Sequence, residues 1–295
     1  MKGHSFYIYC QPYPASRCIS RGFLRGPLPY STRGVCGGYA VGLHGRGCPI
    51  EWFEPLILLG AGIIAGFVNT LAGGGSLLTL PALIFLGLPS PVANGTNRVS
   101  VVMQTAVATG RFQRTGKLDI RSSGPAVVFS ILGAIGGAFI AAELPEEVFD
   151  IALAVVLVLV VLTLFVRTPA GGEGATVGPT WLQAPVFFAI GVYGGFVQAG
   201  VGFLLISGVT WLLGLDLVRT NAVKVLIVLV YSVFALAIFA FYGQVVWLLG
   251  IVLGVGSMIG AWIGVHFAVK RGAGAVRWVI VAAVAASALR LLGVI

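Results

Sequence analysis

Two clusters of small polar residues interrupt a stretch of the chain that is otherwise apolar, residues 62–97. The first cluster holds Asn69, Thr70, the glycines Gly73, Gly74 and Gly75, and Ser76; the second is the run Asn94-Gly95-Thr96-Asn97. Amides, hydroxyls and the unpaired N–H groups at a helix start are neutral donors, which can hold a small anion and release it again. The residue types therefore indicate an anion site rather than a catalytic one.

The three glycines predict a break between two helices. In a bilayer, a broken helix is tolerated only where its backbone groups face protein or a watery cavity. The segment after the break, Leu77–Leu88, is too short to cross a hydrocarbon core about 30 Å thick as a straight helix. We expect Gly74, Gly75 and Ser76 to begin this short helix and to present its N–H groups. Two simpler readings stay open: Ser76 caps the helix, or the glycines serve close packing.

Several other chemistries are excluded by the pattern of residues. No Lys follows Ser76, so the glycines are not a Walker-type phosphate loop, and they do not fit G-x-G-x-x-G. The sequence shows no His, Asp and Glu cluster for a metal and no nucleophile-base pair for catalysis. We therefore expect no enzyme activity, no metal and no cofactor.

Composition places the chain in a membrane. It is 58% hydrophobic and 9% charged, with a mean hydropathy of +1.02, whereas soluble domains are nearer a quarter charged. The sequence predicts an all-α integral membrane protein that crosses the cell membrane several times. The lipid bilayer is then one partner and a small anionic substrate another. Nucleic-acid binding is not expected, and a homo-oligomer is left open.

Residues 1–50 differ from the rest of the chain. They carry six basic residues, no acidic residue and all four cysteines, and the cysteines show no C-x-x-C spacing. A targeting segment and a stretch that is not natural coding sequence are both open readings, whereas a secretory signal lacks its apolar core. We expect a disordered or non-native extension and exclude it from the function.

The remainder divides into two similar halves, 51–167 and 181–295, joined by a polar linker at 168–180. The halves align with Gly62 and Gly66 on Gly191 and Gly195, and with Gly73 on Gly202. Each half would hold about four to five helices, including a short, glycine-broken one near the midplane of the membrane. The sequence predicts helices at about 92–112 and 217–242, and Lys270, Arg271 and Arg277 would lie before the last span. The loop at 111–121 is basic, whereas its counterpart near Gly243 is uncharged. The turn at 143–150 is acidic, whereas its counterpart at 270–277 is basic. By the positive-inside rule the repeats are inverted, although this leaves the basic N-terminus outside.

The alignment extends the candidate site into the second half, because polar residues recur at matching positions. The site residues expected there are Gln198, Gly200, Gly202, Thr220, Asn221 and Lys224. Short, glycine-interrupted segments at matching places of two repeats point to a transporter's substrate site. Lys224 has two readings, attraction of an anion and extension to the membrane interface, and Arg98 poses the same question.

Three segments resemble the TauE/SafE family of membrane proteins. They are residues 66–97, the similar residues 194–203 of the second half, and the run Arg219-Thr220-Asn221-Ala222-Val223-Lys224. The likeness covers about residues 55–295. This resemblance implies a multi-pass transporter associated with export of sulfite and organosulfonates. We therefore expect secondary transport of such an anion. A passive anion channel and a non-transporting membrane partner are the alternatives.

Overall fold

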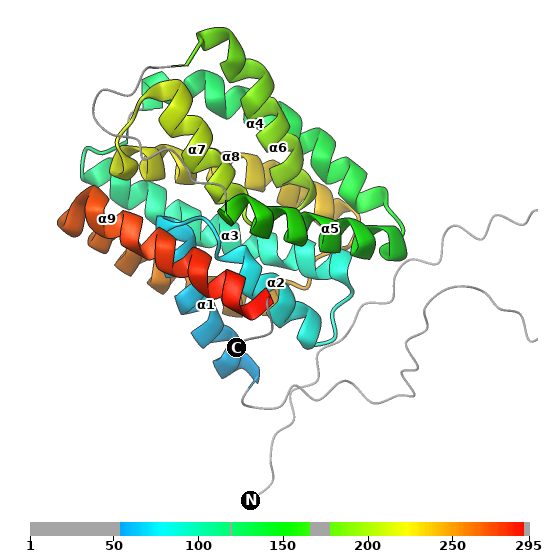
Figure 1. The fold of residues 1–295 in the computed structure, drawn as a ribbon. Helices are drawn as coiled ribbons and strands as arrows, with labels where there is room; N and C mark the ends of the chain where they lie inside the picture. Colours follow the sequence, from blue (N-terminus) through cyan, green and yellow to red (C-terminus); the bar gives the residue numbers. More distant parts are fainter. Residues whose placement is uncertain (1–53, 119, 166–177, 292–295) are drawn as a thin grey trace, which may run out of the picture. The chain divides into compact units, whose positions relative to one another are not determined.

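A computed structural model describes residues 54–118, 120–165 and 178–291 of the chain. All of the regular structure in these ranges is helical, as expected (Figure 1). The helices are α1 (Glu54–Leu71), α2 (Ser76–Phe85), α3 (Ser90–Arg114), α4 (Ile120–Glu143), α5 (Glu146–Phe165), the short 3-10 helix η1 (Thr180–Leu182), α6 (Gln183–Phe196), α7 (Val201–Leu213), α8 (Leu217–Phe241) and α9 (Trp247–Leu291).

Three segments within the described ranges are long and apolar enough to cross a membrane. They are Ser123–Glu143 in α4, Leu217–Phe241 in α8 and Trp247–Arg271 at the start of α9. The apolar helices α1, α2 and α7 are shorter. Large apolar side chains point outward, with Phe85 81% and Phe241 86% exposed. In water such a surface would be unfavourable, whereas lipid tails accommodate it.

Glycines allow α4 and α6 to pack at backbone contact. A Cβ atom on Gly137 would lie 2.0 Å from the carbonyl oxygen of Val192, and one on Gly195 would lie 2.2 Å from that of Ala134. The same arrangement joins α1 to α9, where a Cβ on Gly66 would lie 2.2 Å from the Ser257 carbonyl oxygen. Small residues at such crossings favour van der Waals packing between helices in lipid.

One expected element is wrong. We expected Lys270, Arg271 and Arg277 to separate two spans, but α9 continues through these positions to Leu291. No proline interrupts this stretch, so the backbone hydrogen bonds can continue past the charges. The basic loop that supported the inversion of the second half is therefore helical. The N-terminal extension 1–50 and residues 168–177 of the expected linker lie outside the described residues.

Candidate functional site

The two glycine breaks meet at the backbone. The first lies between α1 and α2, where Gly73 has a φ of 86°, and the second lies between α6 and α7, where Gly200 has a φ of 71°. A Cβ on Gly73 would lie 2.3 Å from the Cα of Gly202, and a Cβ on Gly202 would lie 2.2 Å from the Cα of Gly73. Only glycine fits at either position of this contact. The alignment of the halves paired the same two residues.

The first break ends in a helix start whose first N–H groups have no partner within the helix. The first hydrogen bonds of α2 run from the N–H of Leu77 to the oxygen of Gly74, 3.1 Å, and from the N–H of Leu78 to the oxygen of Gly75, 3.0 Å. The N–H groups of Gly74, Gly75 and Ser76 precede these bonds. The Ser76 side chain makes no capping hydrogen bond, because Gly75 holds the cap position. This end of α2 therefore has the donors that an anion site needs.

Asn97 presents a second donor beside the same break. The Thr79 hydroxyl, one turn into α2, donates to Oδ1 of Asn97 at 2.7 Å. With its oxygen occupied, the amide leaves Nδ2 buried without a hydrogen-bond partner among the described residues. A buried unpaired donor is unfavourable by about 1–3 kcal/mol. Thr79 was not among the predicted site residues, because a single threonine in an apolar helix carries no distinctive signal.

Asn221 repeats this arrangement on α8. Its Oδ1 accepts a hydrogen bond from Nζ of Lys224 at 2.7 Å, and its Nδ2 is buried and unpaired within the described part of the chain. An ammonium can only donate, so Lys224 fixes which side of the amide is the oxygen. The sequence alignment paired Asn97 with Asn221, and in the described part of the chain each has an N–H₂ group without a hydrogen-bond partner.

Of the two predicted readings of Lys224, the structure contradicts extension to the membrane interface, whereas attraction of an anion stays a prediction. Its ammonium also donates to the backbone oxygens of Asn69, at 3.0 Å, and Thr70, at 2.9 Å. These carbonyls belong to the last turn of α1, where a helix has unpaired oxygens and a partial negative charge. The side chain is 2% exposed, so it does not extend to an interface. It joins α8 to the end of α1.

Arg98 makes the reciprocal connection from α3 to α6. Its Nη1 donates to the oxygen of Gly194 at 2.6 Å, and its Nη2 donates to that of Gly195 at 2.7 Å. Nη1 also reaches Oε1 of Gln198 at 2.5 Å. Arg98 was weighed from the sequence but not predicted as a site residue. Each half thus supplies one buried cation to the end of the broken helix in the other half.

Several predicted site residues are occupied by contacts within the protein. Thr70 donates to the oxygen of Gly66 at 2.8 Å, and Thr96 accepts from the N–H of Val246 at 2.9 Å. The Nε2 of Gln198 donates to the Tyr231 hydroxyl at 3.1 Å. These side chains stabilise the helix packing around the breaks and have less capacity for a ligand.

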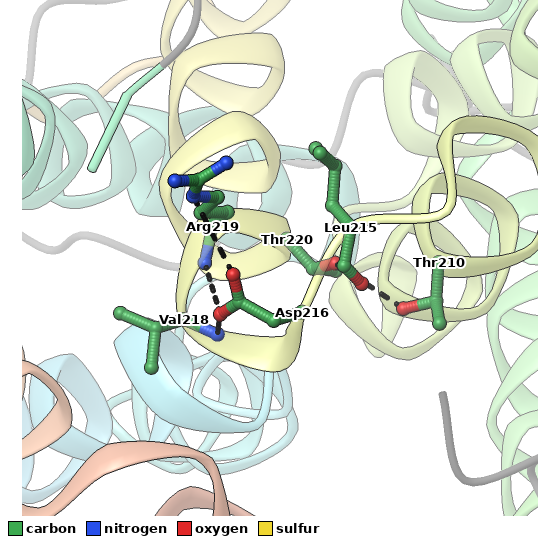
Figure 2. A network of polar contacts seen from close by, with 6 residues as sticks. All are labelled: Thr210, Leu215, Asp216, Val218, Arg219 and Thr220. Carbon is green, nitrogen blue, oxygen red and sulfur yellow. Dashed lines mark hydrogen bonds and ion pairs between the residues drawn. The ribbon is translucent and has the colours of Figure 1, made fainter. Parts of the chain in front are cut away.

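Thr220 belongs to the start of α8, shown in Figure 2. Its hydroxyl donates to the oxygen of Leu215 at 3.1 Å and lies 3.3 Å from that of Thr210. Asp216 caps the helix by accepting from the N–H groups of Val218, at 2.9 Å, and Arg219, at 3.2 Å. Thr220 therefore holds α8 against the loop from α7.

The electrostatics of this region favour an anion. Arg98 and Lys224 are buried, and no buried Asp or Glu side chain occurs among the described residues. Helix ends carry about half a charge each, so carbonyls alone offset the two cations only in part. Three donors here have no partner within the described ranges, and an anion can accept from each of them: Asn97 Nδ2, Asn221 Nδ2 and Arg98 Nε.

Comparison with known proteins agrees with this membrane architecture. The sequence profile described as "Sulfite exporter TauE/SafE" matches residues 58–291. A probable membrane transporter protein, ORF9, from Sinorhizobium sp. is 29% identical over 234 residues, which cover 79% of this chain and 90% of that protein. A probable membrane transporter protein from Haemophilus influenzae is 28% identical over 228 residues, 76% of this chain and 89% of the relative.

The probable membrane transporter protein YfcA of Escherichia coli K12 is 25% identical over 238 residues, covering 80% of this chain and 88% of the relative. No solved structure gives a significant match. Because the profile spans most of the helical region, this chain belongs to the TauE/SafE family of membrane transporter proteins.

Proposed function

We propose that the protein is a multi-pass permease of the cell membrane that exports a small anion, sulfite or an organosulfonate, by secondary transport. The observation that carries the proposal is the matched pair of amides. Asn97 and Asn221 each have the oxygen engaged by another side chain and the N–H₂ group buried and unpaired. Buried donors without partners are rare in folded proteins, and a transient ligand is a reason to retain them.

The location of these donors supports an anion between the two breaks. Asn97 is tied through Thr79 to α2, which follows the first break, and Asn221 is tied through Lys224 to the end of α1, which precedes it. The N–H groups of Gly74, Gly75 and Ser76 lie where the chain passes from the end of α1 to the start of α2. Hydrogen bonds from neutral groups hold an anion less tightly than a direct ion pair, so the substrate can also leave.

Reciprocal contacts support alternating access by two structural repeats. Under the alignment of the halves, α1 corresponds to α6, α3 to α8, and α4 to the start of α9. The contact between α4 and α6 has its counterpart between α9 and α1, and the bonds from α3 to α6 have theirs from α8 to α1. Rocking of one repeat against the other about the Gly73–Gly202 contact would expose the site to each side in turn.

Uptake into proteoliposomes tests the proposal. We would measure labelled sulfite, sulfate, thiosulfate and a sulfonate, with and without an imposed pH gradient, for the wild type and a Ser76→Ala/Asn97→Ala variant. Saturable uptake of one oxyanion that the variant loses is the expected result. Uptake that rises without saturation would indicate a passive channel. Absence of uptake of all four anions, or equal uptake by the variant, would refute the proposed substrate class or site.

A further inference from the structure

Unpaired buried polar atoms are concentrated on one helix. Among the described residues, eight buried side-chain nitrogen or oxygen atoms lack a hydrogen-bond partner, and six of them belong to α3. Three of these six follow a spacing of seven residues: Nδ2 of Asn97, Oε1 of Gln104 and Nε of Arg111. Seven residues are about 20° short of two helical turns, so the three side chains share one face of α3.

This face leads from the candidate site to a basic end of the molecule. Successive members lie about 10 Å apart along the axis at 1.5 Å per residue. Asn97 is fully buried and Gln104 is 4% exposed, whereas Arg111 is half-buried, with its guanidinium 4.3 Å from the centre of the Trp262 ring. Arg114 lies in the last turn of the same helix, and Lys117 follows it.

The equivalent helix of the second half has no such face. Seven and fourteen residues beyond Asn221 are Val228 and Ala235, which are 4% and 0% exposed and pack in apolar clusters. A requirement of the fold common to both repeats would therefore not explain the polar residues of α3. Among the described residues, Gln104 makes no hydrogen bond to the helix ends that Arg98 and Lys224 stabilise.

An apolar cluster lies on the same face between Gln104 and Arg111. Ala108 is eleven residues beyond Asn97, about 20° from it around the helix. It packs with Phe112 of α3, Leu71 at the end of α1, and Val218, Ala222 and Val225 at the start of α8. We refer to these six residues as the apolar plug.

We propose that the Asn97–Gln104–Arg111 face of α3 is the wall of the substrate's route between the central site and the basic end of α3, with Gln104 contacting the anion in passage. This inference rests on the proposed transport function. Arg111 attracts the anion, and the apolar plug closes the route in the conformation described. The Gln104 amide suits a hydrated anion, because it can accept from the anion's water and donate to the anion itself.

Cysteine labelling tests the route. All four native cysteines lie in residues 1–50, so replacing them with serine leaves the helices unaltered. In this background we compare Gln104→Cys with Thr105→Cys, using the anionic reagent 2-sulfonatoethyl methanethiosulfonate on proteoliposomes. Thr105 is the matched control: it is 3% exposed at the same depth, lies about 100° around the helix, and its hydroxyl is already bonded to the Val101 oxygen.

We expect Gln104→Cys to react at least about tenfold faster than Thr105→Cys, because a minor open state would expose the route to the reagent. Excess transported anion should slow the reaction of Gln104→Cys. Ala108→Cys, which adds a single atom on the same face, should behave like Gln104→Cys and serves if that variant fails to fold. Uptake by the serine-substituted parent tests the transport function separately. If the parent transports but neither cysteine reacts faster than Thr105→Cys, the route is wrong. If the parent takes up no anion, the proposed function itself fails.

Discussion

The Asn221→Asp substitution separates a ligand-binding role of Asn221 from a purely structural one. An aspartate retains an oxygen for the Lys224 ammonium, 2.7 Å away in the wild type. At the same time it replaces the unpaired Nδ2 donor with a second oxygen. The bond that holds Lys224 is kept, while the group proposed to face the anion becomes an acceptor with a negative charge.

The magnitude follows from the lost hydrogen bond. A hydrogen bond to a charged partner is worth about 1.5–3 kcal/mol, and about 1.4 kcal/mol is a factor of ten in an equilibrium constant. Anion uptake at low substrate concentration should therefore fall by about 10- to 150-fold, and repulsion by the carboxylate adds to this. Pairing with Lys224 and burial of a second oxygen have opposite effects on folding, so we expect the unfolding midpoint to change little.

The assay compares initial uptake rates in proteoliposomes and thermal unfolding in detergent for the wild type, Asn221→Asp and Asn221→Ala. Asn221→Ala removes the Lys224 acceptor as well as the donor, so it should lose both stability and transport. Transport by Asn221→Asp at the wild-type rate would refute the reasoning, since a structural role alone requires only the oxygen.

Three further predictions concern the packing around the site. Lys224→Met leaves the Asn69 and Thr70 oxygens and Asn221 Oδ1 without a donor, so unfolding measurements should show a loss of about 3 kcal/mol; an unchanged midpoint would contradict this. Gly137→Ala should destabilise by about 1–3 kcal/mol by forcing α4 from α6, while Gly136→Ala, which has open space around its Cβ, should be neutral or stabilising; equal effects would argue against the backbone contact. Gly73→Ala should abolish uptake, whereas Gly87→Ala, with a similar φ of 85° but no neighbour within 4 Å, should retain it; loss in both would assign the effect to backbone strain rather than to the Gly73–Gly202 contact.

Much of the helical layout could be predicted because charges, prolines and glycines mark helix ends. The helix expected at about 92–112 is α3, Ser90–Arg114, and the one expected at about 217–242 is α8, Leu217–Phe241. The same reasoning failed for α9. A charged residue marks where a helix can leave the lipid, but it does not end the helix, and only a break in backbone bonding would do so.

The candidate site was predictable in composition but not in its connections. Asn97 and Asn221 were identified because amides are conspicuous among apolar residues, and the Nδ2 atom of each is buried without a partner among the described residues. Their role in binding an anion stays a prediction. The backbone oxygens that Arg98 and Lys224 bind lie 96 or more residues away in the sequence, so no local pattern could reveal these connections. The hydroxyls of Thr70 and Thr220 bond to nearby backbone oxygens, an alternative that short hydroxyl side chains have in any helix.

The central claim, that a small oxyanion binds beside the contact of the two breaks, is tested most directly with selenite. Selenium replaces sulfur in this anion and gives an anomalous X-ray signal. We predict one anomalous peak beside the Gly73–Gly202 contact, within hydrogen-bonding distance of Asn97 or Asn221, in crystals of a protein shown to transport selenite. A peak elsewhere, or no peak at saturating selenite in crystals of such a protein, would contradict the account.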